Sequence, residues 1–150
     1  MSAPSPHRIE TEDGIRDVVR RSRRIAVLGI KTEEQAGQPA FDVPEYLAGA
    51  GLDVIPVPVY YPDRTEILGR KVYRRLQDIP GDIDLVDVFR RPTDIDQHLD
   101  DILAKKPKAV WFQLGIRNDR AADRLAAAGI DVVQDRCLLV EHGRFQDGKS

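Results

Sequence analysis

Short apolar runs alternate with amphipathic segments along most of the chain. Five runs have the length and β-branched character of buried strands, and they span Ile25–Ile30, Leu52–Val57, Asp84–Phe89, Lys108–Leu114 and Ile130–Gln134. Segments with apolar residues at helical spacing lie between them. Strands that alternate with helices imply a parallel sheet with right-handed crossovers. The pattern therefore predicts an α/β fold with one doubly wound parallel sheet of about five strands and helices on both faces.

Capping residues sharpen the expected helix boundaries. Helices are predicted over Glu12–Arg21, Phe41–Ala50, Thr93–Ala104 and Asn118–Ala128, and a last helical turn over Cys137–Glu141. In the second helix, Asp42 suits the N-cap, Pro44 the first turn and Gly51 the position after the C-terminus. Thr93 and Asp96 stand at capping-box spacing at the start of the third helix.

The remaining segments lack clear periodicity. Residues 60–80 have no apolar helical face, so we expect a long loop with one or two helical turns. The first eleven residues are rich in proline and serine and predict a poorly ordered arm, and residues 146–150 predict a frayed polar tail. We therefore expect one folded domain over residues 12–145, which fits a chain of 150 residues.

Composition excludes several classes of function. The net charge of −2 gives no sign of the strongly basic face that nucleic-acid binding requires. No apolar run reaches the ~18–20 residues of a membrane span. Cys137 is the single cysteine, which rules out an intramolecular disulfide and agrees with a reducing compartment. We expect a cytoplasmic protein with no nucleic-acid or membrane partner.

The turn after the first strand is the first candidate ligand site. Gly29 ends that strand, and about a dozen residues separate it from the next helix, whose N-terminus could bind a diphosphate. The dinucleotide fingerprint G-x-G-x-x-G is absent, because the next glycine is Gly37. The second strand also lacks an acidic residue at its end, since Asp53 stands at its start. A nicotinamide-dependent dehydrogenase is therefore disfavoured.

Two other strand ends carry candidate binding groups. Arg90 and Arg91 follow the third strand, where guanidinium groups suit phosphate, although exposed arginines paired with acids would look the same. Gln113 ends the fourth strand, where its amide could hold a ligand. Trp111 precedes it and is interpreted as a core residue.

The last motif leaves two interpretations open. Cys137, Glu141 and His142 could form a catalytic or metal-binding group, or an acid–arginine pair and a small buried thiol could lock the last strand. A zinc site needs three or four ligands, and the cysteine and histidine supply two. Nucleophilic catalysis needs a geometry that spacing cannot show. We predict a structural role, with no catalytic residue and no metal ligand.

Taken together, these motifs resemble one family. The chain is similar to small stand-alone CoA-binding proteins, whose Rossmann-like domain matches the nucleotide-binding domain of the succinyl-CoA synthetase α-subunit. The resemblance runs from about Ile25 to Phe145. It rests on I-A-V-L-G at Ile25–Gly29, P-A-F-D-V-P-E-Y-L at Pro39–Leu47, V-I-P-V at Val54–Val57, I-L-G-R-K-V-Y at Ile67–Tyr73, V-D-V-F-R-R-P at Val86–Pro92, V-W-F-Q-L-G-I at Val110–Ile116 and D-R-C-L-L-V-E-H-G-R at Asp135–Arg144.

The resemblance implies coenzyme A, or an acyl-CoA, held at the C-terminal edge of the sheet. The residues it implies are Gly29, Ile30, Lys31, Thr32, Phe41, Val57, Pro58, Phe89, Arg90, Gln113, Leu114 and Gly115. Some positions differ from the family pattern: Lys31 replaces a common serine, Gln38 a frequent arginine and Phe41 a tyrosine. Pro58-Val59 stands where Asn-Pro is usual, and the first loop is about two residues longer.

These observations predict a CoA-binding protein without chemistry of its own. Its expected partner is the small-molecule ligand, and a second copy of the chain or another protein is left open. One alternative is a scaffold or interaction module whose ligand pocket has decayed, because the differences fall in the pocket. The other is an enzyme that uses Cys137 and His142.

Overall fold

The core of the molecule is one parallel sheet, seen in a computed structural model that describes residues 5–147. The strand order is β2-β1-β5-β6-β7, and all neighbouring strands are parallel. The strands are β1 (Arg24–Leu28), β2 (Asp53–Val57), β5 (Leu85–Val88), β6 (Ala109–Phe112) and β7 (Asp131–Val133). The predicted five-stranded, doubly wound Rossmann-like sheet is confirmed, and each strand is one to three residues shorter than expected.

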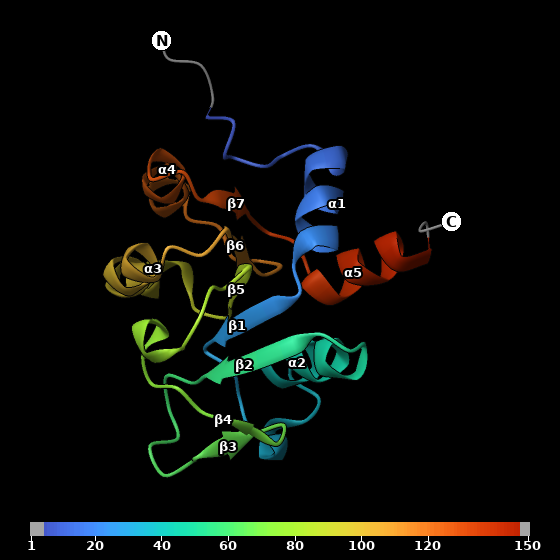
Figure 1. Cartoon of the computed structure of the whole chain (residues 1–150), viewed down its shortest axis with the longest axis vertical. Coiled ribbons are helices and arrows are strands. Elements are labelled where there is room, and N and C mark those ends of the chain that lie inside the picture. Colours follow the sequence, from blue (N-terminus) through green and yellow to red (C-terminus); the bar gives the residue numbers. More distant parts are fainter. Residues whose placement is uncertain (1–4, 148–150) are drawn as a thin grey trace.

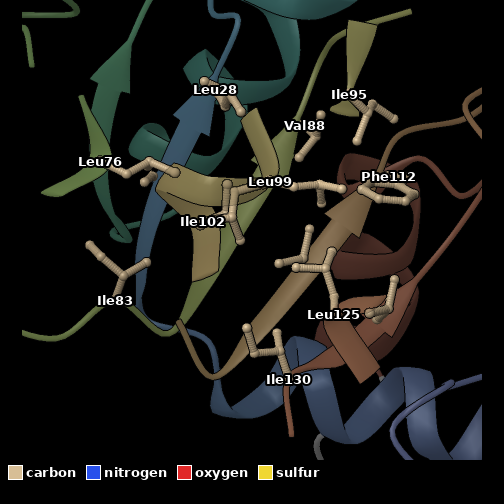
Figure 2. Close-up of a cluster of buried hydrophobic side chains, with 14 of the residues drawn as sticks. Leu28, Leu76, Ile83, Val88, Ile95, Leu99, Ile102, Phe112, Leu125 and Ile130 are labelled. Carbon is tan, nitrogen blue, oxygen red and sulfur yellow. The ribbon is translucent and has the colours of Figure 1, made fainter. Parts of the chain in front are cut away.

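Helices cover both faces of the sheet (Figure 1). One side carries α1 (Glu12–Arg21), α2 (Pro39–Gly49) and α5 (Leu138–Asp147), and the other carries α3 (Leu99–Lys105) and α4 (Asp119–Ala127). Each interface buries its own apolar cluster. Figure 2 shows the cluster on the α3 and α4 side, where Leu99 of α3 points toward Phe112 of β6. Burial of these side chains supplies the main stabilising free energy.

One buried residue of the sheet has an ionisable side chain. Asp87 lies in β5 between Val27 of β1 and Trp111 of β6, and its side chain is 0% exposed. Neither carboxyl oxygen has a hydrogen-bond partner. Burial raises the pKa of Asp87 well above its usual value, which favours the neutral acid. The sequence places this aspartate among apolar strand residues, and its carboxyl group is buried with them.

The first helix has the predicted limits. Thr11 caps α1 by accepting a hydrogen bond from the Gly14 amide at 3.1 Å, and Ile15, Val18 and Val19 are buried. A capping residue and one apolar stripe are both local signals. These two signals were enough to predict both ends of α1.

The second helix begins two residues earlier than predicted. Gln38 is the N-cap and Pro39 takes the first helical position, whereas Asp42 accepts a hydrogen bond from the Gly37 amide at 2.8 Å within the first turn. Pro44 lies inside the helix and not at its start. The predicted boundary was wrong because two prolines and an aspartate all suit a helix N-terminus, and spacing alone did not rank them.

The segment after β5 is less regular than predicted. In place of one helix over residues 93–104, two 3₁₀ turns, η3 (Pro92–Asp94) and η4 (Asp96–His98), precede α3. Thr93 makes no capping bond, since Pro92 starts the first turn and Arg91 donates to Asp94 at 2.9 Å. The buried stripe itself is as predicted, with Ile95, Leu99 and Ile102 in the core.

The long connection from β2 to β5 contains an unexpected hairpin. Strands β3 (Glu66–Ile67) and β4 (Arg70–Lys71) pair antiparallel beside β2, as Figure 1 shows, and one helical turn, η2 (Leu76–Asp78), follows as expected. The Tyr73 amide donates to Pro56 at 3.0 Å. This bond covers part of the outer edge of β2.

Both ends of the described chain pack against the domain. Ile9 donates to the Val132 carbonyl at 2.9 Å, and the Val132 amide donates to His7 at 2.8 Å, so part of the predicted arm lies along β7. At the other end, the predicted single turn is the ten-residue helix α5, which extends into the segment expected to be a frayed tail. Residues 1–4 and 148–150 lie outside the described range.

Candidate functional site

A crevice lies at the point where the chain changes direction across the sheet. From β1 the chain runs through α2 to β2 on one side, and it then crosses to β5 on the other side of β1. Open α/β sheets bind ligands at such a switch point, beyond the carboxyl ends of the strands. Three adjoining cavities of about 330, 230 and 370 Å³ occupy this edge, and we call them together the edge crevice.

The lining residues show that the cavities adjoin. Val59 lines both the first and second cavities, while Lys31, Phe89, Arg90 and Arg91 line both the second and third. The crevice therefore extends from the end of β2 past β1 and β5 to the end of β6. Its volume is in the range of small-molecule sites.

Backbone hydrogen bonds hold the first turn close to the strands. The Gly29 amide donates to Val57 at 2.9 Å, and the Phe89 amide donates to Leu28 at 2.9 Å. The ends of β1, β2 and β5 therefore stay in register up to the crevice floor.

Lys31 is positioned by a proline in α2. Pro44 has no amide proton, so the carbonyl of Ala40, four residues earlier, cannot form its usual helical bond. That carbonyl accepts instead from the Lys31 amide at 3.1 Å. The Lys31 ammonium in turn donates to the Gln38 side chain at 2.5 Å. The lysine thus lies beside the N-terminus of α2, and both features favour an anion.

Within the longer first loop, the middle turn is held away from the crevice, whereas Lys31 and Gln38 on either side of it line the third cavity. This turn, η1 (Glu33–Gln35), is capped by the buried Thr32, whose hydroxyl donates to Gln35 at 2.7 Å. Glu33 accepts from the Leu68 amide at 2.8 Å and pairs with Arg64 at 3.1 Å. The loop therefore docks on the β3–β4 hairpin.

Arg90 is the most enclosed cation of the crevice. Its side chain is 11% exposed, and its Nε donates to His98 Nε2 at 3.1 Å. Asp94 lies 3.7 Å from its Nη2, and the Tyr60 ring centroid lies 5.9 Å from the guanidinium carbon. Arg91, by contrast, is 81% exposed at its side chain and pairs with Asp94. The two arginines, which the sequence left equivalent, have different environments.

A tyrosine pair forms one wall of the crevice. Tyr60 and Tyr61 line the second cavity, and their rings meet edge to face with centroids 6.5 Å apart. Tyr61 has a positive φ of 64°, a conformation that is unfavourable for a bulky residue. Arg74 holds this segment by donating to the carbonyls of Tyr60, Tyr61 and Arg64 at 3.1, 2.7 and 2.8 Å.

The end of β6 supplies the opposite wall. Leu114 is 68% exposed, and it lines the third cavity together with Gly115. Gln113, one residue earlier, turns inward and is 4% exposed. Its side-chain oxygen accepts from the Leu138 amide at 3.1 Å and so caps α5.

The structure brings most of the predicted site residues to one place. Nine of the twelve line the edge crevice: Gly29, Ile30, Lys31, Val57, Pro58, Phe89, Arg90, Leu114 and Gly115. Thr32, Phe41 and Gln113 are buried and are not among the lining residues of these cavities. Their role in binding, like that of the other nine, stays a prediction.

Sequence reasoning missed several lining residues. Tyr60 and Tyr61 follow the end of β2 closely, so the rule that strand ends face the ligand could have identified them. Arg74, His98 and Asp101 also line the first cavity. They come from the hairpin connection and the η4–α3 segment, and no local motif marks them.

The cysteine–histidine motif lies in α5 and at its start. Cys137 is a half-buried free thiol just before the helix. His142 is 5% exposed, and its Nδ1 lies 2.9 Å from the Tyr46 hydroxyl of α2. Burial lowers the pKa of His142, which favours its neutral form. Glu141, also buried, pairs with Arg144 at 2.8 Å. The contact of His142 with Tyr46 joins α5 to α2, whereas the Glu141–Arg144 pair lies within α5.

Within residues 5–147, no group of three or more histidine, cysteine, aspartate or glutamate side chains is arranged to hold a metal ion. No helix in the same range is both long and apolar enough to cross a membrane.

The fold and the crevice define a Rossmann-like α/β domain, and comparison with known proteins identifies its family. The family model described as "CoA binding domain" matches residues 23–143, so the chain belongs to the CoA-binding domain family. YneT of Bacillus subtilis is 33% identical over 128 residues, which cover 85% of this chain and 91% of YneT.

Solved structures agree with this assignment. A Thermus thermophilus protein is 38% identical with a TM-score of 0.81, and the match covers 91% of this chain and 99% of that one. A protein from Pyrococcus horikoshii OT3 is 32% identical with a TM-score of 0.80, covering 97% and 99% of the two chains.

Proposed function

We propose that this protein binds coenzyme A, or an acyl-CoA, in the edge crevice. One observation carries the proposal: Lys31, beside the N-terminus of α2, and the enclosed Arg90 line the same cavity at the switch point of the sheet. Two cations and a helix N-terminus suit a diphosphate. Membership of the CoA-binding domain family supports the same ligand.

The remaining walls suit the other parts of the ligand. Val57, Pro58 and Leu76 give the first cavity an apolar lining with a charged rim. Tyr60 adds an aromatic surface next to the arginine. Such a mixture of apolar walls and a few polar groups is typical of cofactor sites.

Retained binding is favoured over a decayed pocket. Decay predicts that Pro58 and the longer first loop fill the space beside β1. Pro58 instead lines a cavity of about 330 Å³, and Glu33 of that loop is bound to Leu68 and Arg64. The crevice is thus open beside both differences.

We further propose that the protein performs no chemistry of its own. The crevice walls carry cations, aromatic rings, apolar groups and Asp101, and the one imidazole among the named lining residues, His98, accepts a hydrogen bond from Arg90. The cysteine–histidine motif belongs to α5 and the residue before it, where His142 contacts Tyr46. Binding and presentation of the cofactor is the role that these residues support.

Calorimetric titration of the full chain with CoA tests the proposal, and a thermal-shift assay is a second, independent measurement of binding. Ligand at 100 times its dissociation constant should stabilise the folded state by about 2.7 kcal/mol. Pantetheine, which lacks the phosphates, should bind much more weakly if Lys31 and Arg90 hold the diphosphate. Absence of binding at millimolar CoA, acetyl-CoA and succinyl-CoA would contradict the proposal and favour the decayed scaffold.

A further inference from the structure

We propose that His98 positions Arg90 for ligand binding: as a neutral imidazole it accepts a hydrogen bond that holds the guanidinium at the crevice, and its protonation releases the arginine and weakens binding. This inference rests on the proposed function and adds a regulated residue to the same site.

The hydrogen bond defines the state of the imidazole. Arg90 Nε can only donate, so His98 Nε2, at 3.1 Å, must accept with a lone pair. The proton of the neutral ring is then on Nδ1. A protonated ring has no acceptor, and it would place a second cation against the guanidinium.

The same bond orients the binding group. Arginine loses considerable rotamer entropy when it is ordered, and a side chain that is ordered beforehand binds with less loss. His98 holds Nε from η4, and Asp94 faces Nη2 from η3 at 3.7 Å. Tyr60 covers the guanidinium from the β2 side. Arg90 is thereby kept between the second and third cavities.

The charges around His98 oppose one another. Burial, followed by the positive charge of Arg90, lowers the pKa of His98, while Asp101 and Asp94 act in the opposite direction. Arg74 lines the same cavity as His98 and adds a further cation. The neutral form is therefore favoured near neutral pH, and acidification converts it to the cation.

The test compares the pH dependence of CoA affinity between variants. Wild-type affinity should fall about tenfold from pH 8 to pH 5.5 beyond the change caused by the ligand's own phosphates. His98→Gln keeps a neutral acceptor, so it should retain most of the affinity at pH 8 and lose this extra dependence. His98→Ala should bind more weakly at both pH values. His7→Gln, which removes a histidine at the β7 edge, should behave as wild type.

A ligand-free measurement separates this inference from the proposed function. In NMR titrations, Arg90→Gln should raise the pKa of His98 because it removes the neighbouring cation. An unchanged pKa would overturn the Arg90–His98 coupling. If wild type and His98→Gln bind CoA with the same pH profile, the positioning role is wrong although CoA remains the ligand. If no variant binds CoA, the proposed function fails, and the proposed effect of His98 on binding fails with it.

Discussion

Gly29 and Phe89 approach so closely that no side chain fits between them. A Cβ atom on Gly29 would lie 2.4 Å from the Phe89 carbonyl oxygen, and Gly29 has a φ of +88°. The two residues follow β1 and β5, the strands that flank the switch point. Glycine at this position therefore lets the two strand ends meet at the floor of the crevice.

The first prediction concerns this contact. Gly29→Ala should destabilise the fold by about 1–3 kcal/mol and weaken CoA binding, since both the clash and the positive φ oppose a side chain. Gly49→Ala is the matched control. It lies within α2 with open space around it, so it should stabilise the fold by about 0.5–1 kcal/mol. Urea unfolding measures both, and equal stability of the two variants would contradict the packing argument.

Lys31 should affect binding and not stability. Lys31→Ala should weaken CoA binding about tenfold at low salt, because a charge-assisted contact with phosphate is lost. The difference should shrink at high salt through screening. Lys71→Ala removes a cation that lines none of the three cavities and should bind normally. Calorimetry at two salt concentrations measures these affinities. An unchanged affinity of Lys31→Ala at low salt would contradict a contact between Lys31 and phosphate.

Gln113 should show the opposite behaviour. Gln113→Ala removes the acceptor for the Leu138 amide and should cost about 1 kcal/mol of unfolding free energy, as loss of a helix cap does. CoA affinity should change little, because the side chain turns away from the crevice. Denaturation and titration of the same sample test this. A large loss of affinity with unchanged stability would assign Gln113 to the ligand.

Arg74 should control the order of the tyrosine wall. Arg74→Ala removes three hydrogen bonds to the segment that carries Tyr60 and Tyr61. Amide exchange of residues 59–64 should become faster, and CoA binding should weaken several-fold. The neighbouring Arg75→Ala removes an exposed ion pair with Asp101 and serves as the control, with little effect on either measurement. Equal amide-exchange rates in the two variants would contradict the proposal that Arg74 orders the segment.

Asp87 and Asp84 should respond to pH with opposite signs. The raised pKa of Asp87 means that its ionisation penalises folding as pH rises above 3.8, so Asp87→Asn should become more stable relative to wild type from pH 4.5 to pH 8. Each unit of pKa shift corresponds to about 1.4 kcal/mol. Urea unfolding at both pH values is the measurement, and a constant difference would mean that Asp87 is not protonated in the folded state.

Asp84, three residues earlier, is the control. Burial opposes its ionisation, but the amides of Arg24 and Arg23, together with Lys108, lower its pKa overall. Its stabilising contribution is present above pH 3.8 and is lost as pH falls through the lower folded pKa. Asp84→Asn should therefore be less stable than wild type at both pH 4.5 and pH 8.

The sequence by itself determined the fold class and the edge of the sheet at which most of the candidate residues lie. Five apolar runs separated by amphipathic segments specify a parallel α/β sheet, and Thr11 with its apolar stripe specifies α1. Gly29 was recognised because it ends the first predicted strand, and Arg90 because it directly follows the third. These signals are local, since hydrophobic period, caps and strand ends are all read from neighbouring residues.

Only the tertiary structure decided what each of these residues contacts. The strand end that carries Gln113 does not show that its side chain caps α5, and the neighbouring arginines 90 and 91 differ only through the contact of Arg90 with His98. The consequence of Pro44 involves Lys31, whose amide donates to the Ala40 carbonyl that the proline leaves without a helical partner. Such pairings join elements far apart in the chain, and they depend on how the helices dock on the sheet. Periodicity specifies which face of an element is buried, but it does not specify which distant side chain meets it there.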